Sequence, residues 1–210
     1  MVNAIYGRKV GSTQVFSEAG AAIHVTAIEA APCTVVQVKN TAGDGYNALK
    51  VGFVDIKEKK LNNPIKGIYT KNKLGARKYL KEIRLEDLDV DYKPGDQIDV
   101  DIFAVGDRVK ISGISRGRGF AGVIKRHNFH RGPMTHGSHS IRKTGSIGMC
   151  ATPSKVHKGK KMPGRMGGKN VTVPFAEIID IIKDQNLILV KGSVPGSAGN
   201  VVMVKKVVKK

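Results

Sequence analysis

The amino-acid sequence predicts a mainly β protein, either a barrel or a sandwich, interrupted by a long basic excursion. Apolar and polar residues alternate with a period of two in many short stretches, and glycine-rich turns separate these stretches. The stretches lie on both sides of residues 112–170, which lack the alternation. A chain of 210 residues is also long enough to bury a core. The excursion therefore leaves the β domain and returns to it.

The alternating stretches predict strands in chain order, and turn residues mark where they end. Pro, Gly, Asp and Asn are typical of such turns. The predicted strands are 23–27, 36–38, 48–54, 98–102, 109–111, 171–173, 178–182, 187–191 and 201–204. The predicted turns are 43–45, 94–96, 184–186 and 195–197.

Residues 55–93 interrupt this strand pattern. The first part, 55–75, loses the alternation and is rich in Lys and Asn, which indicates an exposed loop. Ala76, Tyr79, Leu80 and Ile83 then follow the i, i+3, i+4, i+7 spacing of an amphipathic helix. We therefore expect a loop and a short helix in this region.

The net charge of +19 is concentrated in one segment. Residues 108–176 contain 15 Lys and Arg, five of the six His, and no Asp or Glu. The rest of the chain carries 21 basic and 17 acidic residues and is nearly neutral. A segment with this charge repels itself in water, so it needs a polyanion, and nucleic acid is the leading partner class.

Other classes of protein are disfavoured by the same sequence. No run of 18 apolar residues predicts a transmembrane helix, and the N-terminal residues lack a signal-peptide pattern. Two cysteines, Cys33 and Cys150, do not make a disulfide framework, so a reducing cytoplasm is the expected location. We expect Cys33 to be a core residue and Cys150 to be a small apolar filler.

The excursion has the composition of an RNA-binding segment. Its apolar residues are too sparse for an independent core, and it holds many Gly residues. Glycine lets the backbone run close to a surface, and Arg and Lys neutralise phosphates. Such a segment suits folding within nucleic acid, and counterion release predicts strongly salt-dependent binding.

Short motifs in the excursion are weak evidence for nucleotide binding, metal binding or catalysis. The run Ser115–Gly122 resembles a phosphate loop but lacks the Gly-Lys-Ser/Thr ending. The pairs His127/His130 and His136/His139 have the spacing of metal ligands, but the surrounding cations would repel a metal ion. Cys150 near a His suggests a thiol nucleophile, yet no nearby Asn or Asp can orient the His. We expect no catalytic residue, metal site, cofactor or small-molecule substrate.

Several ordered motifs resemble one family. They are GRGFAG at 117–122, KRH at 125–127, THGS at 135–138, GSIG at 145–148, Thr152-Pro153 and KGKKMPGRMG at 158–167. Further matches are GRKVGST at 7–13 and NLILVKGSVPG at 186–196. Together they are similar to bacterial large-subunit ribosomal protein L3 (uL3) over essentially the whole chain.

The resemblance implies a globular β-barrel with a long, basic, largely irregular internal extension. It places the barrel at 1–115 plus 169–210, with the loop and short-helix insertion at about 55–93, and the extension at 116–168. In that family the extension enters 23S rRNA and reaches towards the peptidyl transferase centre. The family acts early in 50S assembly, with ribosomal proteins L14 and L19 as neighbours. The implied location is therefore the large subunit of the cytoplasmic ribosome.

Site residues follow from the resemblance and the charge. The expected rRNA-binding residues are Arg116, Arg118, Lys125, Arg126, His127, Arg131, His136, Arg142, Lys143, Lys155, Lys158, Lys160, Lys161 and Arg165. The expected tip near the peptidyl transferase centre is Gly145, Ser146, Ile147, Gly148, Met149, Cys150, Ala151, Thr152 and Pro153.

A DNA-binding architectural protein is the main alternative, since charge alone permits it. The sequence has no helix-turn-helix, zinc-finger or basic-zipper pattern, and a glycine-rich excursion suits irregular RNA better than a DNA groove. An enzyme is the second alternative, and it would lose activity on replacement of Cys150 by Ser. A membrane-surface protein is disfavoured, because the sequence shows no strongly amphipathic basic helix.

Overall fold

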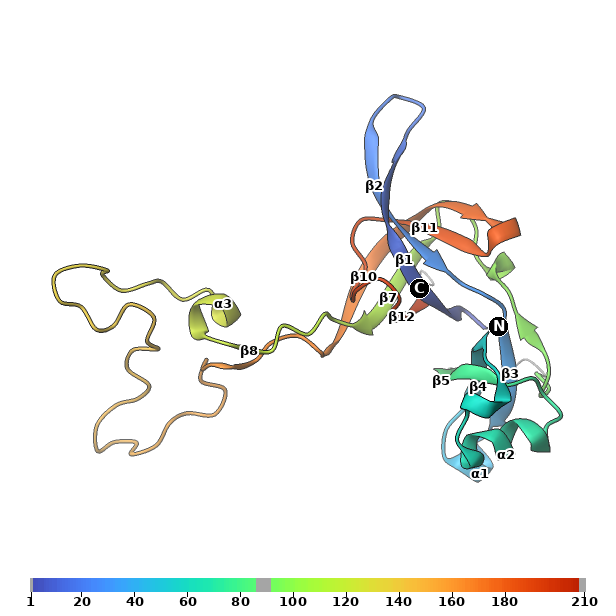
Figure 1. Ribbon diagram of the computed structural model, residues 1–210, viewed down its shortest axis with the longest axis horizontal. Coiled ribbons are helices and arrows are strands. Elements are labelled where there is room, and N and C mark those ends of the chain that lie inside the picture. Colours follow the sequence, from blue (N-terminus) through green and yellow to red (C-terminus); the bar gives the residue numbers. More distant parts are fainter. Residues whose placement is uncertain (1, 86–91, 208–210) are drawn as a thin grey trace. The chain divides into compact units, whose positions relative to one another are not determined.

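The computed structural model describes residues 2–85 and 92–207 and divides the chain into two compact units (Figure 1). One unit is Met1–Ile114 with Asn170–Lys210, and the other is Ser115–Lys169. The first unit contains the main core, and the second consists of the basic excursion. Among the described residues, no helix is long and apolar enough to cross a membrane.

Six strands of the first unit close into an antiparallel barrel, which confirms the predicted β architecture. Their order around the barrel is β1 (Ala4–Phe16), β12 (Val201–Lys206), β7 (Arg108–Ile114), β10 (Asn170–Ile182), β11 (Leu187–Lys191) and β2 (Ala22–Glu29). Every neighbouring pair is antiparallel. Alternate residues such as Val109 and Ile111 are fully buried, as the period of two requires. The barrel closes over a filled apolar interior.

Strand β10 joins two segments that the sequence predicted as separate strands. Pro174 lies between them, and proline has no N–H for the ladder. The register between β10 and β7 shifts between Val173 and Ala176, so a bulge takes up the proline. One strand therefore runs through Pro174, from Asn170 to Ile182.

A four-stranded sheet packs into the same core. Its order is β5 (Arg77–Arg84), β4 (Ala48–Asp55), β3 (Cys33–Lys39) and β6 (Gln97–Ile98). The short helix α1 (Thr41–Asp44) joins β3 to β4, while η1 (Glu58–Lys60) and α2 (Asn63–Lys71) join β4 to β5. Phe53 of this sheet stacks between Tyr6 of the barrel and Tyr79, with ring centroids 5.5 and 5.4 Å away. Barrel and sheet thus share one core.

Three predictions in this region are wrong. Residues 77–83 of the predicted helix lie in strand β5, because they pair with β4 and bury Ile83. The helix lies instead within the predicted loop, as α2, where Pro64 lies in the first turn and Tyr69 is buried. The strand predicted at 98–102 ends at Ile98, and Val100–Ile102 forms a 3-10 turn, η2, that still buries Val100.

The long strand β1 was not predicted. Its first half lies in the barrel, and its register with β2 shifts between Lys9 and Gly11. Beyond that bulge, β1 and β2 continue as a two-stranded hairpin that extends past the barrel strands and ends near Phe16, which is 65% exposed (Figure 1).

Candidate nucleic-acid interface

The two arms of the basic unit begin as an irregular antiparallel ribbon. The Ser115 N–H donates to the Lys169 carbonyl (2.9 Å), and the Arg118 N–H donates to the Met166 carbonyl (2.8 Å). The ribbon continues as β8 (Phe120–Ala121) paired with β9 (Gly164–Arg165). Gly167 has φ +75°, and a Cβ there would collide with the Arg116 carbonyl. Backbone hydrogen bonds therefore hold the arms side by side.

A single turn of helix, α3 (Val123–His127), follows the ribbon and is tied to the returning arm. Arg126 Nη1 donates to the Met162 carbonyl oxygen at 2.7 Å, and His127 Nε2 donates to the same oxygen at 3.1 Å. The Arg126 guanidinium packs against Gly164, where a Cβ would overlap it. Val123 is only 2% exposed, so this point has local packing although the unit lacks a large core.

Beyond α3 the chain forms two irregular loops before it returns (Figure 1). The first loop is closed where the Gly132 N–H donates to the Ile141 carbonyl at 3.1 Å. A Cβ on Gly132 would lie 2.7 Å from the Ser140 carbonyl oxygen, so glycine allows this close approach. The second loop spans 144–161 and contains the predicted tip.

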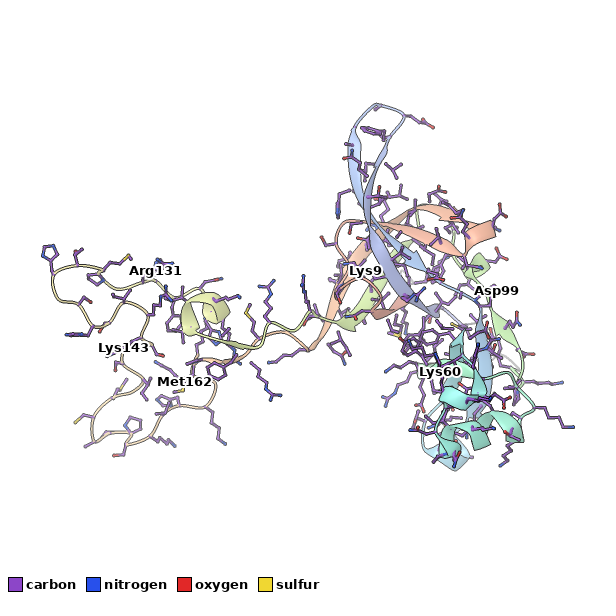
Figure 2. The ribbon with its side chains drawn as sticks, in the orientation of Figure 1. Lys9, Lys60, Asp99, Arg131, Lys143 and Met162 are labelled. Carbon is purple, nitrogen blue, oxygen red and sulfur yellow. The ribbon has the colours of Figure 1, made fainter. Side chains whose placement is uncertain are left out.

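Nearly all the predicted rRNA-binding side chains of this unit are exposed (Figure 2). Arg126 and His127 are half-buried, because both bind the Met162 carbonyl. The exposed residues are Arg116, Arg118, Lys125, Arg131, His136, Arg142, Lys143, Lys155, Lys158, Lys160, Lys161 and Arg165. Lys169, at the base of the ribbon, is also exposed and was left out of the predicted set. Lys169 belongs to the same acid-free run of cations in the sequence, but it lies one residue past the predicted end of the extension.

The structure brings three of these cations to one hollow. Lys125, Arg131 and Arg142 line one hollow of about 330 Å³ with Gly122, Val123 and Ile124. Arg116, Arg118 and Arg165 lie instead along the ribbon. The second loop carries Lys155, Lys158, Lys160 and Lys161.

The charges of the two units are balanced in different ways. Residues 115–169 contain 13 Lys and Arg and no carboxylate. In the barrel unit, Lys39 lies 2.9 Å from Glu82, and Lys206 lies 2.7 Å from Asp107. The hydrogen bond from Lys39 lowers the pKa of Glu82, and that from Lys206 lowers the pKa of Asp107. The basic unit has no such internal partners, so an external anion must balance it.

The predicted tip, Gly145–Pro153, is exposed throughout except for a half-buried Pro153. Met149 is 78% and Ile147 42% exposed. The two cysteines have opposite surroundings. Cys33 is fully buried, as predicted, and burial raises the pKa of its thiol to about 11. Cys150 is exposed, so its prediction as a filler is wrong, because its side chain is not packed in an apolar environment.

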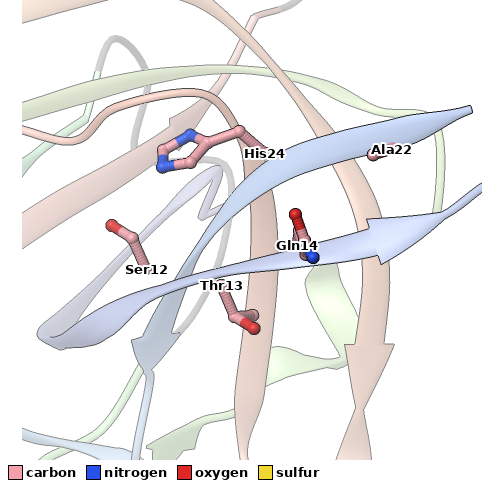
Figure 3. Close-up of a pocket in the computed structure, with 5 residues that line it drawn as sticks. All are labelled: Ser12, Thr13, Gln14, Ala22 and His24. Carbon is pink, nitrogen blue, oxygen red and sulfur yellow. The ribbon is translucent and has the colours of Figure 1, made fainter.

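A separate hollow of about 390 Å³ lies on the β1–β2 hairpin, lined by Ser12, Thr13, Gln14, Ala22 and His24 (Figure 3). The Ser12 hydroxyl lies 3.3 Å from that of Thr26, within reach of a hydrogen bond, and no carboxylate lines the hollow. Over residues 2–85 and 92–207, no group of three or more His, Cys, Asp and Glu could hold a metal ion.

Comparison with known proteins finds similarity to one family. A family model described as ribosomal protein L3 matches residues 93–186, which include the whole basic unit. The chain is also 51% identical over 209 residues to the large ribosomal subunit protein uL3 of Carboxydothermus hydrogenoformans. That match covers 100% of this chain and 99% of the relative.

Proposed function

Because the chain belongs to the ribosomal protein L3 family and is a structural component of the large ribosomal subunit, we propose that its basic unit binds 23S rRNA directly. One observation carries the proposal. Residues 115–169 present 13 Lys and Arg, nearly all exposed, without a single carboxylate. The proposed contacts are the fourteen residues predicted from the sequence, together with Lys169.

The mechanism is phosphate neutralisation along a narrow ribbon. Each cation that meets a phosphate releases condensed counterions, and this release drives binding. Contacts of this kind position a protein on RNA without reading sequence. The ribbon brings two backbone arms within hydrogen-bond distance, so it fits where rRNA segments pack closely. The unit thereby lets RNA segments that repel each other approach.

We divide the roles between the two parts of the chain. Residues 1–115 with 169–210 form the globular anchor, and 116–168 form the rRNA-penetrating extension. We place the tip, 145–153, towards the peptidyl transferase centre on the family resemblance alone. Met149 and Ile147 are exposed there and can pack against a partner. Its side chains supply no catalytic group for peptide-bond formation.

The order of assembly and the protein neighbours follow from the same placement. An extension that lies among rRNA helices enters more easily before those helices have packed, so the protein joins the large subunit early. Ribosomal proteins L14 and L19 are its proposed neighbours on the globular side. Both points rest on the family.

Salt washing of large subunits tests the proposal. Subunits are washed at increasing ammonium chloride and separated on sucrose gradients, and each fraction is probed for this chain. An embedded extension keeps the chain with the subunit at salt that strips peripheral proteins, because buried ion contacts are screened least. Release at modest salt, with the chain running free, would contradict the proposal.

A further inference from the structure

Three cations meet at one place in the basic unit. Lys125 comes from α3, Arg131 from the chain after it, and Arg142 from the far side of the first loop. All three line the same hollow, of about 330 Å³. The sequence separates Arg131 from Arg142 by 11 positions, so the fold brings them together.

Two fixed points hold this arrangement. The hydrogen bond from Gly132 N–H to the Ile141 carbonyl joins the residues next to Arg131 and Arg142. The close approach of Gly132 to Ser140 leaves no room for a side chain there. On the other side, the residues after Lys125 are tied to the Met162 carbonyl. These contacts hold together the parts of the chain that carry the three cations.

The hollow has the charge of an anion site. No acidic residue lines it, and the whole unit contains none. Three like charges around one space repel each other unless an anion lies between them. Arginine can bind two oxygens of a phosphate at once, and lysine adds a compact charge. The remaining lining, from Val123 and Ile124, is apolar.

We propose that this hollow is a receptor for a single nucleotide of the bound rRNA. Lys125, Arg131 and Arg142 bind its phosphodiester together, and the ribose lies against Ile124, the half-buried apolar residue of the lining. The volume is near the lower limit of small-ligand sites, roughly 300 Å³, which suits one nucleotide. Gly122 leaves the wall open, since a Cβ there would meet nothing within 4 Å. This proposal rests on the proposed rRNA binding and adds one shared phosphate to it.

Phosphate-ethylation interference is the sharpest test. A 23S rRNA transcript is ethylated at random phosphates and bound to the full-length chain, and the bound RNA is mapped. The full-length variants are Lys125→Gln, Arg131→Gln and Arg142→Gln, with Lys158→Gln as the matched control outside the hollow. We expect one phosphate whose ethylation blocks RNA binding by the wild type and by the control. Ethylation of the same phosphate should not weaken RNA binding by any of the three hollow variants any further. Three different phosphates, one for each variant, would overturn the proposal.

Affinities provide a second, independent measurement. Each hollow substitution should weaken binding by about tenfold, as expected for a charge-assisted hydrogen bond. The double variant Arg131→Gln/Arg142→Gln should lose less than the product of the single losses, because both act on one group. Losses that multiply, or no loss, would overturn the shared phosphate.

The control separates this failure from failure of the proposed function. Lys158→Gln/Lys160→Gln/Lys161→Gln neutralises three cations of the second loop. If this variant weakens binding while the hollow variants do not, rRNA binding stands and the receptor falls. If the wild type itself does not bind the transcript, both fall. Arg131→Lys and Arg142→Lys keep the charge and should restore part of the affinity.

Discussion

At the scale of single residues, the partner of a charge indicates its role. Lys39 and Lys206 lie against Glu82 and Asp107, and these pairs belong to the structure of the barrel unit. Arg126 and His127 share the Met162 carbonyl and hold two arms of the basic unit together. The exposed cations of that unit have no carboxylate in their own segment, and for this reason we assign them to the proposed RNA contacts.

Asp107→Asn tests one of these structural charges. Asp107 accepts hydrogen bonds from Lys206 (2.7 Å) and from the Ala104 N–H (2.9 Å), and these lower the pKa of its carboxyl. A lowered pKa contributes stability above the unfolded value, and this contribution is lost as pH falls through the folded value. We expect the variant to lose about 1 kcal/mol at pH 7. The difference should shrink as pH falls below the ordinary value of 3.8.

Urea denaturation at a series of pH values measures this effect. Asp101→Asn is the control, because Asp101 pairs with Lys183 where both side chains are about 70% exposed. An exposed pair of this kind contributes little, so the control should change the free energy of unfolding by less than about 0.5 kcal/mol. Equal losses in both variants, or a loss for Asp107→Asn that persists at pH 2, would refute the assignment.

At the scale of elements, the sequence predicts a strand correctly where a short apolar run is also buried. The predicted range 187–191 matches β11, in which three consecutive residues, Ile188 to Val190, are buried. The helix predicted at 76–83 was wrong because Tyr79, Leu80 and Ile83 have helical spacing in the sequence and are also half-buried or buried in a strand. Pairing with β4 decides between helix and strand here. A short stretch of sequence around residue 80 does not show that β4 will be its partner. In β1, Gly7, Arg8 and Lys9 hide the alternation.

The candidate site divides in the same way. The acid-free run of cations is visible in the sequence, so the segment could be predicted. That Lys125, Arg131 and Arg142 share a hollow could not, because it depends on the Gly132–Ile141 hydrogen bond and on α3. The exposure of Cys150 was also missed, since a sequence does not show that a loop tip lacks packing neighbours.

Arg126→Ala tests the element that joins the two arms. The substitution removes the 2.7 Å hydrogen bond to the Met162 carbonyl and the packing on Gly164. We expect α3 to open more often, with amide hydrogen exchange at positions 126 and 128 faster by about fivefold, as for loss of roughly 1 kcal/mol. NMR hydrogen exchange measures it. Lys125→Ala, on the exposed side of α3, is the control, and equal acceleration there would show that the tie does not hold α3.

At the scale of the whole molecule, the barrel unit is complete without the extension. All six barrel strands and the main core cluster come from residues outside 115–169. The residues that flank the extension also lie together, because the Ser115 N–H donates to the Lys169 carbonyl at 2.9 Å. The barrel architecture and the cations proposed to bind RNA therefore reside in different parts of one chain.

Replacing residues 116–168 with Asn-Gly separates the two. A two-residue Asn-Gly turn can join hydrogen-bonded antiparallel ends such as 115 and 169. The shortened chain should keep its barrel, with a free energy of unfolding within about 1 kcal/mol of the full chain. It loses 12 of the 13 cations of the basic unit, so its affinity for 23S rRNA should fall by at least about a thousandfold. Filter binding between 50 and 200 mM salt, estimated to span the steep range, tests this, with circular dichroism to check the barrel. A folded, shortened chain that still binds 23S rRNA tightly and with strong salt dependence would move the interface to the barrel unit, since all the remaining cations except Lys169 belong to that unit.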